Sequence, residues 1–289
     1  MKILRIFICG VLPENSGKTT VAEVLTKWLV DNKFKVTPFK PLSAHSYWWQ
    51  YDSYLENIKR NMLVSEDAIK LWKASESEIP IEIINPCDML LSIPDYSYYG
   101  YQRFIKLILE RKTFDLLAIG RFTKVREGRL WRMIYFKGNT VLEDNFLEKL
   151  MRKANEIIEV KSEEEFLNLH KIHYNEAVES CYNRVLEYRP DVLIIESFND
   201  AVYPWRGIEE CDLIIAVAPT VLLLYDKKEF IHAIHIFKDP YILEFHRIAD
   251  LIEPYKVIKV KPLGSCEMKN KKRVFKMYNS LIEEICSIL

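Results

Sequence analysis

A lysine and two threonines stand where an apolar run meets a helix, and their types and spacing suit phosphate chemistry. The run Ile3–Gly10 is followed by a short loop and then by Gly17, Lys18, Thr19 and Thr20. In this order, loop N–H groups can surround phosphate oxygens and the helix N-terminus adds partial positive charge. Lys18 would neutralise β- and γ-phosphates, and the Thr19 hydroxyl would reach Mg²⁺. The sequence therefore predicts a nucleotide site made by Glu14, Asn15, Ser16, Gly17, Lys18, Thr19 and Thr20.

The spacing of this loop is irregular. Six residues separate Gly10 from Gly17, whereas the usual P-loop has about four between its first glycine and the Gly-Lys pair. The alternative is a plain strand, turn and helix that bind nothing.

A second lysine ends the next predicted strand, Phe34–Lys40, where Pro41 stops it. In an open α/β sheet, ligands bind at the carboxyl ends of the strands. Lys40 is therefore expected to point toward the same crevice as the loop. A solvated lysine at a strand end is the alternative.

Two carboxylates are candidate magnesium ligands. Glu196 ends the apolar run Asp191–Glu196, which is expected to be buried on both faces as in a parallel sheet. An acid delivered there can hold or order Mg²⁺. Asp52 opens a predicted helix, where it could be a second ligand or simply a carboxylate favoured by the helix dipole. The predicted metal ligands are Thr19, Asp52 and Glu196.

The elements that must position these residues follow from apolar periodicity. A helix over 17–32 joins the first two strands, which are expected to be parallel with a right-handed crossover. Further predicted helices cover 65–74, with Ser65 as N-cap, 101–111, 143–160, 162–188 and 268–289, and further strands cover 81–84, 211–219 and 255–260. Residues 93–100 are expected to form a loop. His170 and His173 are expected to be solvated or packed against a partner rather than metal ligands.

Residues 113–139 predict an inserted β-hairpin that turns at Gly128. It is basic, carrying Arg121, Lys124, Arg126, Arg129, Arg132 and Lys137 against Glu127. It could be a solvated hairpin, an oligomer contact or a clamp for an anionic ligand. The hairpin does not favour nucleic acid as a partner, because nucleic-acid-binding surfaces need a wider basic face with exposed aromatics.

Composition narrows the class of protein. The formal net charge is zero, so the chain has no overall positive charge that would attract nucleic acid. The six cysteines are scattered without a C-x-x-C pair, which disfavours a disulfide framework and a zinc ribbon. Met1 and Lys2 lead straight into a strand, and no apolar run reaches the length of a membrane span. We expect one cytoplasmic domain over residues 1–289, with 143–188 as a long helical segment.

Four segments together resemble dethiobiotin synthetase and its relatives, the ATPases of the cobyric and cobyrinic acid synthetase type. They are Glu14–Thr19, Phe39–Ser43, the helix-opening Asp52 and the acidic strand Leu193–Glu196, and Ile84-Asn85-Pro86 is a weaker echo. The resemblance covers about residues 1–92 and 185–263.

This resemblance implies a P-loop NTPase fold: an α/β, doubly wound, mostly parallel sheet with helices on both faces. It implies ATP and Mg²⁺ as cofactors, Lys18 and Lys40 as catalytic residues, and Ser43 toward the substrate. Thr19, Asp52 and Glu196 would gather the metal. A homodimer with a small-molecule substrate near the interface is also implied.

The sequence departs from the family in two places. The phosphate loop has one residue more between its glycines, and Ser197–Ala201 is bulkier than the family's glycine-rich turn. Phe198 and Asn199 would intrude where the family's backbone approaches nucleotide or substrate.

The expected function is that of a Mg-ATP-dependent enzyme of the dethiobiotin synthetase type, which phosphorylates or ligates a small carboxylate or amine. One alternative is a nucleotide-switched ATPase that binds or assembles a protein partner through residues 143–188 and the hairpin. Another is a structural relative with a degenerate pocket.

Overall fold

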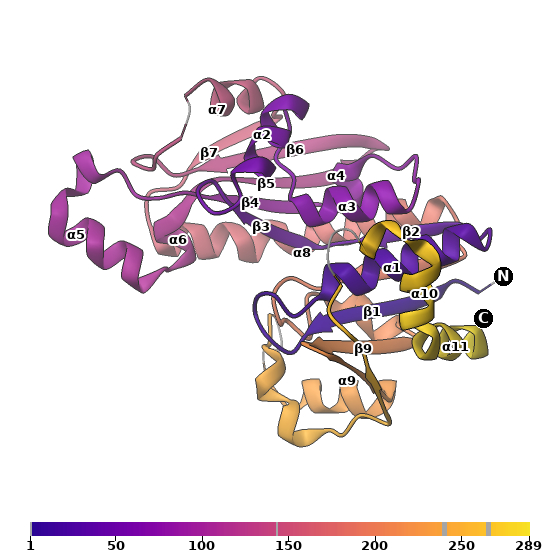
Figure 1. The fold of residues 1–289 in the computed structure, drawn as a ribbon. Coiled ribbons are helices and arrows are strands. Elements are labelled where there is room, and N and C mark those ends of the chain that lie inside the picture. Colours follow the sequence, from indigo (N-terminus) through magenta and orange to yellow (C-terminus); the bar gives the residue numbers. More distant parts are fainter. Residues whose placement is uncertain (1, 143, 239–241, 264–266) are drawn as a thin grey trace. The chain divides into compact units, whose positions relative to one another are not determined.

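The computed structural model describes residues 2–142, 144–238, 242–263 and 267–289, and its chain forms two compact units (Figure 1). Unit 1 comprises Met1–Pro41, Lys70–Glu78 and Tyr188–Leu289, and unit 2 comprises Leu42–Ile69 and Ile79–Glu187. Each unit has its own sheet. The structure thus differs from the single domain expected over 1–289, because strands between residues 42 and 159 pair with one another and not with those of unit 1.

The sheet of unit 1 has six strands in the order β11-β10-β9-β1-β8-β2. Their bounds are β1 (Leu4–Gly10), β2 (Val36–Phe39), β8 (Val192–Glu196), β9 (Leu213–Ala218), β10 (Val221–Tyr225) and β11 (Lys256–Lys259). The four strands β2, β8, β1 and β9 are mutually parallel, and β10 runs antiparallel to both of its neighbours. The predicted α/β class and helix-connected parallel strands are confirmed, within a mixed sheet.

The strand β8 lies between β1 and β2, so the first crossover joins parallel strands that are not adjacent. All five residues of β8 are buried, as expected for a strand covered on both faces. The antiparallel β10 was not predicted. It follows β9 after a two-residue turn in which Thr220 has a φ of 71°.

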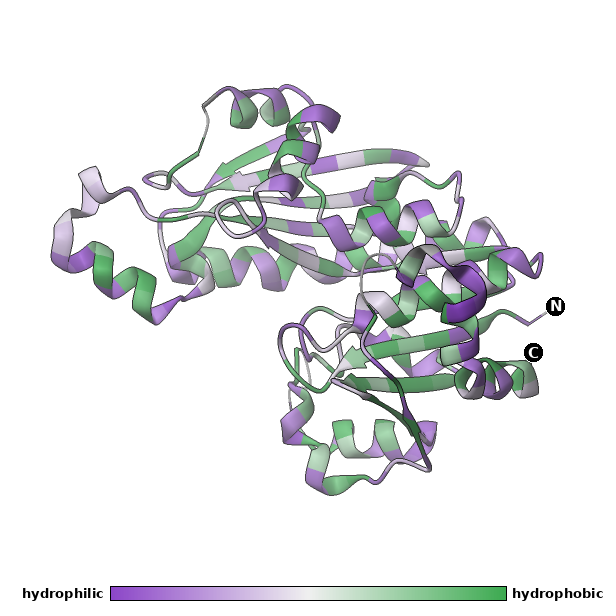
Figure 2. Cartoon of the chain, in the orientation of Figure 1, coloured by the Kyte–Doolittle hydropathy of each residue, from purple (hydrophilic) through white to green (hydrophobic). Residues whose placement is uncertain are grey.

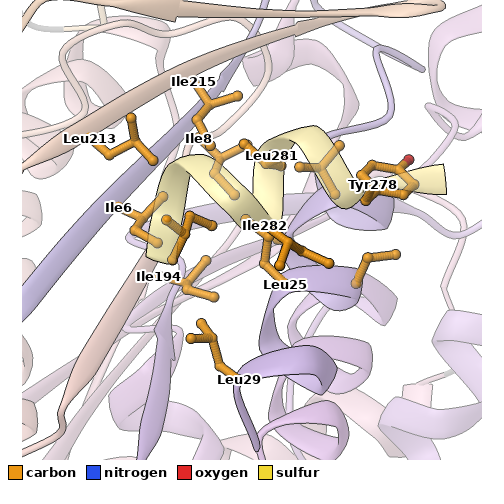
Figure 3. Close-up of a cluster of buried hydrophobic side chains, with 14 of the residues drawn as sticks. Ile6, Ile8, Leu25, Leu29, Ile194, Leu213, Ile215, Tyr278, Leu281 and Ile282 are labelled. Atoms are coloured by element: carbon orange, nitrogen blue, oxygen red, sulfur yellow. The ribbon is translucent and has the colours of Figure 1, made fainter. Parts of the chain in front are cut away.

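Helices cover both faces of this sheet. Ile6 and Ile8 of β1 pack in a cluster with Leu25 of α1 and Leu281 of α11 (Figure 3). Phe7, which points to the other face, packs against a ring of α9. The helices are α1 (Lys18–Asp31), α9 (Lys227–His235), α10 (Lys271–Met277) and α11 (Asn279–Ile288), and short 3₁₀ helices are η1 (Arg206–Glu210), η2 (Phe245–Arg247), η3 (Ala249–Leu251) and η4 (Glu267–Lys269). The apolar strands β1 and β9 are green along most of their length in Figure 2.

The sheet of unit 2 has five strands in the order β3-β4-β5-β6-β7. They are β3 (Leu42–Ser46), β4 (Cys87–Leu91), β5 (Leu117–Arg126), β6 (Arg129–Phe136) and β7 (Glu156–Glu159). The predicted hairpin is confirmed as β5 and β6, which pair antiparallel around Glu127 and Gly128. Rather than an isolated insertion, it contributes two central strands of this sheet.

Helices also cover both faces of the second sheet (Figure 1). On one face, α8 packs against β5, and Phe166 and His170 contact Phe122 of that strand or Tyr135 of β6. On the other, Tyr54 packs in a cluster of α2, α7 and strand residues. The helices are α2 (Tyr51–Arg60), α4 (Ile81–Ile84), α5 (Tyr96–Glu110), α6 (Thr113–Leu116), α7 (Asp144–Met151) and α8 (Glu163–Glu187), and α3 (Glu66–Ala74) contributes residues to both units.

Several predicted elements are wrong in type or extent. Ile81–Ile84 is a helical turn rather than a strand, because Pro80 O and Ile81 O accept from backbone N–H groups three or four residues later. The helix expected over 143–160 ends at Met151, and Glu156–Glu159 instead add a parallel strand to the edge of β6. The predicted helix over 268–289 is divided at Tyr278.

The helix expected over 101–111 begins earlier than predicted. The Asp95 side chain caps α5 by accepting from Ser97 N, so part of the expected 93–100 loop is helical. Gly100 interrupts the helix with φ 68° and ψ 169°. None of the helices in the described part of the chain combines the length and the apolar composition that a membrane span requires.

Candidate functional site

The loop after β1 bends tightly over Gly10. A Cβ atom on Gly10 would lie 2.7 Å from Leu12 O and 2.8 Å from Ser16 Oγ, closer than real Cβ contacts. The loop begins where Val11 N donates to Val217 O over 2.9 Å. It ends at Gly17, whose φ of 94° suits glycine. The chain therefore forms a narrow cradle between a buried strand and a helix N-terminus.

Lys18 folds back into this cradle. Its Nζ lies 3.2 Å from Ser16 Oγ, and both side chains are buried. A Cβ on Gly10 would lie 3.0 Å from the same ammonium group. The first turn of α1 has no acidic residue, so the partial positive charge of its N-terminus is not offset locally. An anion in the cradle would meet a lysine and a helix N-terminus together.

One carboxylate oxygen of Glu196, at the end of β8, connects the start of α1 with the end of β2. Glu196 Oε1 accepts from Thr19 Oγ1 over 2.9 Å and from Lys40 Nζ over 2.5 Å. The register explains this arrangement, because β8 pairs with β1 through Ile8 and with β2 through Phe39, just before Lys40. The structure therefore brings together Thr19, Lys40 and Glu196, as the sequence predicted.

Asp200 is a residue that the sequence prediction missed. It follows β8 in the turn that contains Asn199, whose φ is 47°, and it is largely buried. Burial raises the pKa of its carboxyl, while the positive charge of Lys18 is among the influences that lower it. The sequence signal was an acid four residues after Glu196.

Two predicted site residues, Asp52 and Ser43, belong to unit 2. Asp52 is exposed in the first turn of α2, which agrees with its alternative role at a helix N-terminus. Within unit 1, therefore, only Thr19 and Glu196 of the three predicted metal ligands are brought together.

Ser43 lies in a buried polar cluster of unit 2. Its Oγ donates to Asp88 Oδ1 over 2.6 Å and lies 3.0 Å from Asn85 Oδ1. His45, also buried, has its Nδ1 3.5 Å from Asp88 Oδ2. Ser43 pairs with Asp88 in the register of β3 and β4, so these contacts follow from the sheet itself.

Three basic residues of the hairpin, Arg121, Arg132 and Lys137, are held by the chain's own oxygen atoms. Arg121 is buried and donates to backbone carbonyls, and Lys137 Nζ donates to two more. Arg132 forms two hydrogen bonds, of 2.7 and 2.8 Å, with the Glu82 carboxylate. The expectation of a solvated hairpin is therefore wrong for Arg121, and these contacts do not favour an anion clamp.

Lys124 of the hairpin is also buried, against α8. Its Nζ lies 2.8 Å from His173 Nδ1, donates to Glu176 and lies 5.0 Å from the ring centre of Trp131. His173 is therefore packed against a side chain of its own chain. Burial, and then the charge of Lys124, lower the pKa of His173.

A magnesium ion with a nucleotide fits the unit 1 residues by their donor set. Mg²⁺ is usually held by one or two carboxylates together with substrate phosphates rather than by an all-protein cage. In the part of the chain that the structure describes, no group of three or more His, Cys, Asp or Glu side chains could hold a metal. Thr19 and Glu196, beside the Gly10 cradle, provide the hydroxyl and the single carboxylate that a site shared with substrate phosphates would use.

Comparison of the chain with protein-family models found no match, and comparison with curated proteins found no significant match.

Proposed function

We propose that this chain is a Mg-ATP-dependent enzyme that phosphorylates or ligates a small carboxylate or amine, in the manner of dethiobiotin synthetase. The observation that carries the proposal is the contact of Glu196 Oε1 with both Thr19 Oγ1 and Lys40 Nζ beside the Gly10 cradle. A phosphate loop with its lysine and a strand-end acid recur in phosphoryl-transfer sites, and a second lysine would add positive charge where the transferred group carries negative charge.

Each residue has a distinct role in this proposal. Thr19 gives its one hydroxyl proton to Glu196, so its lone pairs remain to face a cation. Glu196 fixes that orientation. Lys18 donates to phosphate oxygens at the N-terminus of α1, and Lys40 adds positive charge at the end of β2. When bound, Mg²⁺ supplies neutralisation of the phosphate oxygens.

Nucleotide binding is tested by thermal unfolding with and without Mg-ATP. A ligand that binds only the folded state raises the melting temperature by mass action. Lys18→Ala should abolish that rise. Lys27→Ala is the matched control, since Lys27 lies on the same helix and pairs with Glu23, and it should keep the rise. If Lys18→Ala binds Mg-ATP as well as the wild type, the proposal fails.

The reaction type is tested by ATP turnover in the presence of small carboxylates and amines. An enzyme of the proposed type hydrolyses or transfers the γ-phosphoryl group only when its substrate is present. Lys40→Ala should abolish this substrate-dependent turnover. Turnover that is slow, continuous and indifferent to every small molecule tested would argue against a ligase.

The second candidate is a nucleotide-switched ATPase with a macromolecular partner. Unit 2 carries exposed apolar side chains on α5, where Tyr101 is 67% and Leu109 76% exposed. Such exposure marks interaction surfaces when side chains of this kind gather together. This candidate predicts slow ATP hydrolysis by the chain alone, and acceleration by a partner that is lost in Leu109→Asp.

A further inference from the structure

An aromatic pocket opens on unit 2 where β3 leads into α2. Tyr47, Trp48 and Tyr51 line a volume of about 330 Å³. Small-molecule sites start at roughly 300 Å³, so this pocket suits a small ligand or one group of a larger one. Tyr47 N donates to Leu91 O over 2.7 Å, which attaches this wall of the pocket to the sheet.

The ring of Tyr47 is held from beneath. It meets Tyr54 edge to face at 4.7 Å between ring centroids, and Tyr54 in turn meets Phe146 at 5.3 Å. Tyr54 is fully buried. Tyr47 also lies edge to face with Tyr51 at 5.7 Å. The two tyrosine walls are therefore tied to the core of unit 2.

The outer rings of the pocket remain open. Trp48 is 65% exposed and Tyr51 is 43% exposed. Ring faces carry negative potential and attract cations. Asp52 follows Tyr51 directly and is exposed, so its carboxylate adds negative charge on the same turn. The chemistry of the pocket thus favours a cation over an anion.

The ring of the neighbouring residue, Trp49, already contacts a cationic side chain of the protein. The Arg111 guanidinium lies over Trp49 at 5.1 Å from its ring centre. Over Trp48, by contrast, no cationic side chain of the described residues is found. One tryptophan of the pair is therefore matched within the protein, whereas Trp48 is exposed and lines the pocket.

We propose that Tyr47, Trp48 and Tyr51 bind an organic cation through a methylated, quaternary ammonium group. A primary ammonium would lose hydrogen bonds to water that ring faces do not replace. A quaternary ammonium has no N–H donors, and its methyl groups pack on aromatic carbon while its charge meets the ring faces. This inference is independent of the proposed nucleotide function, since it concerns residues of unit 2 alone.

The test is titration of the full-length protein with choline, followed by tryptophan fluorescence at constant ionic strength. The comparison ligand is 3,3-dimethylbutan-1-ol, which has the same shape and no charge. Choline should bind saturably, and the neutral alcohol should bind more weakly by about two- to thirtyfold, the range that a cation–π contact supplies. Equal affinity for the two ligands would overturn the proposal.

Variants distinguish the pocket from the neighbouring ring. Trp48→Ala and Tyr51→Ala should each weaken choline binding by about two- to thirtyfold. Tyr51→Phe keeps an aromatic ring at this position and should retain the affinity for choline. Trp49→Ala is the matched control and should bind choline like the wild type. Thermal unfolding of each variant establishes that it is folded. Loss of binding in Trp49→Ala but not in Trp48→Ala, or no saturation by choline, would refute the assignment.

Discussion

The Nζ atom of Lys40 lies 2.5 Å from Oε1 of Glu196, and the two side chains are only 5% and 0% exposed. This pair joins the ends of two adjacent parallel strands, β2 and β8. Both charged groups are buried away from water, so each is stabilised by the opposite charge of the other. The same carboxylate oxygen also accepts from Thr19, which makes the pair the centre of the candidate site.

Removing either charge of this pair should destabilise the protein strongly. Lys40→Met and Glu196→Gln are each expected to lower the free energy of unfolding by about 3–5 kcal/mol, because the remaining buried charge loses the opposite charge of the ion pair. The double variant should lose less than the sum of the two single losses. Urea unfolding of all four proteins measures the coupling, and strictly additive losses would show that the contact contributes nothing.

Gly10→Ala should distort the cradle. The new Cβ would lie 2.7 Å from Leu12 O, a backbone atom that cannot move independently of the loop. We expect a loss of about 1–3 kcal/mol in the free energy of unfolding and a smaller rise of the melting temperature with Mg-ATP.

Gly138→Ala is the control for this substitution. A Cβ there would meet only Glu159 Oε1, at an ordinary 3.7 Å, so stability should change by less than about 0.5 kcal/mol. If Gly10→Ala behaves like this control in both measurements, the close approach of the loop has no energetic consequence.

Arg121→Met should destabilise unit 2. The guanidinium donates to Leu63 O at 3.0 Å, Asn85 O at 2.8 Å and Pro86 O at 3.2 Å, and also to Thr123 Oγ1. Its loss leaves buried acceptors unsatisfied, which costs about 3–5 kcal/mol in the free energy of unfolding. Arg121→Lys should not restore the loss, since an ammonium lacks the planar fork.

Arg129→Met tests whether this effect belongs to the buried position. Arg129 lies on the same hairpin and is exposed, so its replacement should change stability by less than about 0.5 kcal/mol. Equal losses in the two variants, measured by chemical unfolding, would contradict the structural role of Arg121.

His170 should make stability fall in mild acid. Its ring lies against Phe122 and Phe166, and its Nε2 is 2.8 Å from Tyr135 Oη. Burial lowers its pKa to about 4, whereas an unfolded histidine titrates near about 6.5. Between these values the unfolded state binds more protons, so stability is lost as the pH falls from about 6.5 to about 4.

The loss attributable to His170 is at most about 3 kcal/mol and should level off below that window. His170→Phe removes this contribution, and the slope of unfolding free energy against pH should become shallower. Some slope should remain, because burial also lowers the pKa of His173. An unchanged slope in His170→Phe would show that the pKa of His170 is the same in the folded and the unfolded protein.

The sequence by itself determined the local parts of the site. The strand Leu4–Gly10, the loop and the helix Lys18–Asp31 follow from apolar spacing and glycines over a short stretch. The buried strand that ends in Glu196 is equally local. These features depend on neighbouring residues, so pattern and propensity suffice to predict them.

The tertiary structure decided which of these parts meet and which side chains are buried. Lys40 and Glu196 are 156 residues apart in the chain, and their contact depends on β8 lying between β1 and β2. The burial of Arg121, the short strand β3 and the placement of Asp52 in unit 2 likewise depend on long-range pairing. The local sequence around a charged residue is the same whether its side chain hydrogen-bonds to water or to a carbonyl far along the chain. Only the folded chain brings such a carbonyl within hydrogen-bond distance.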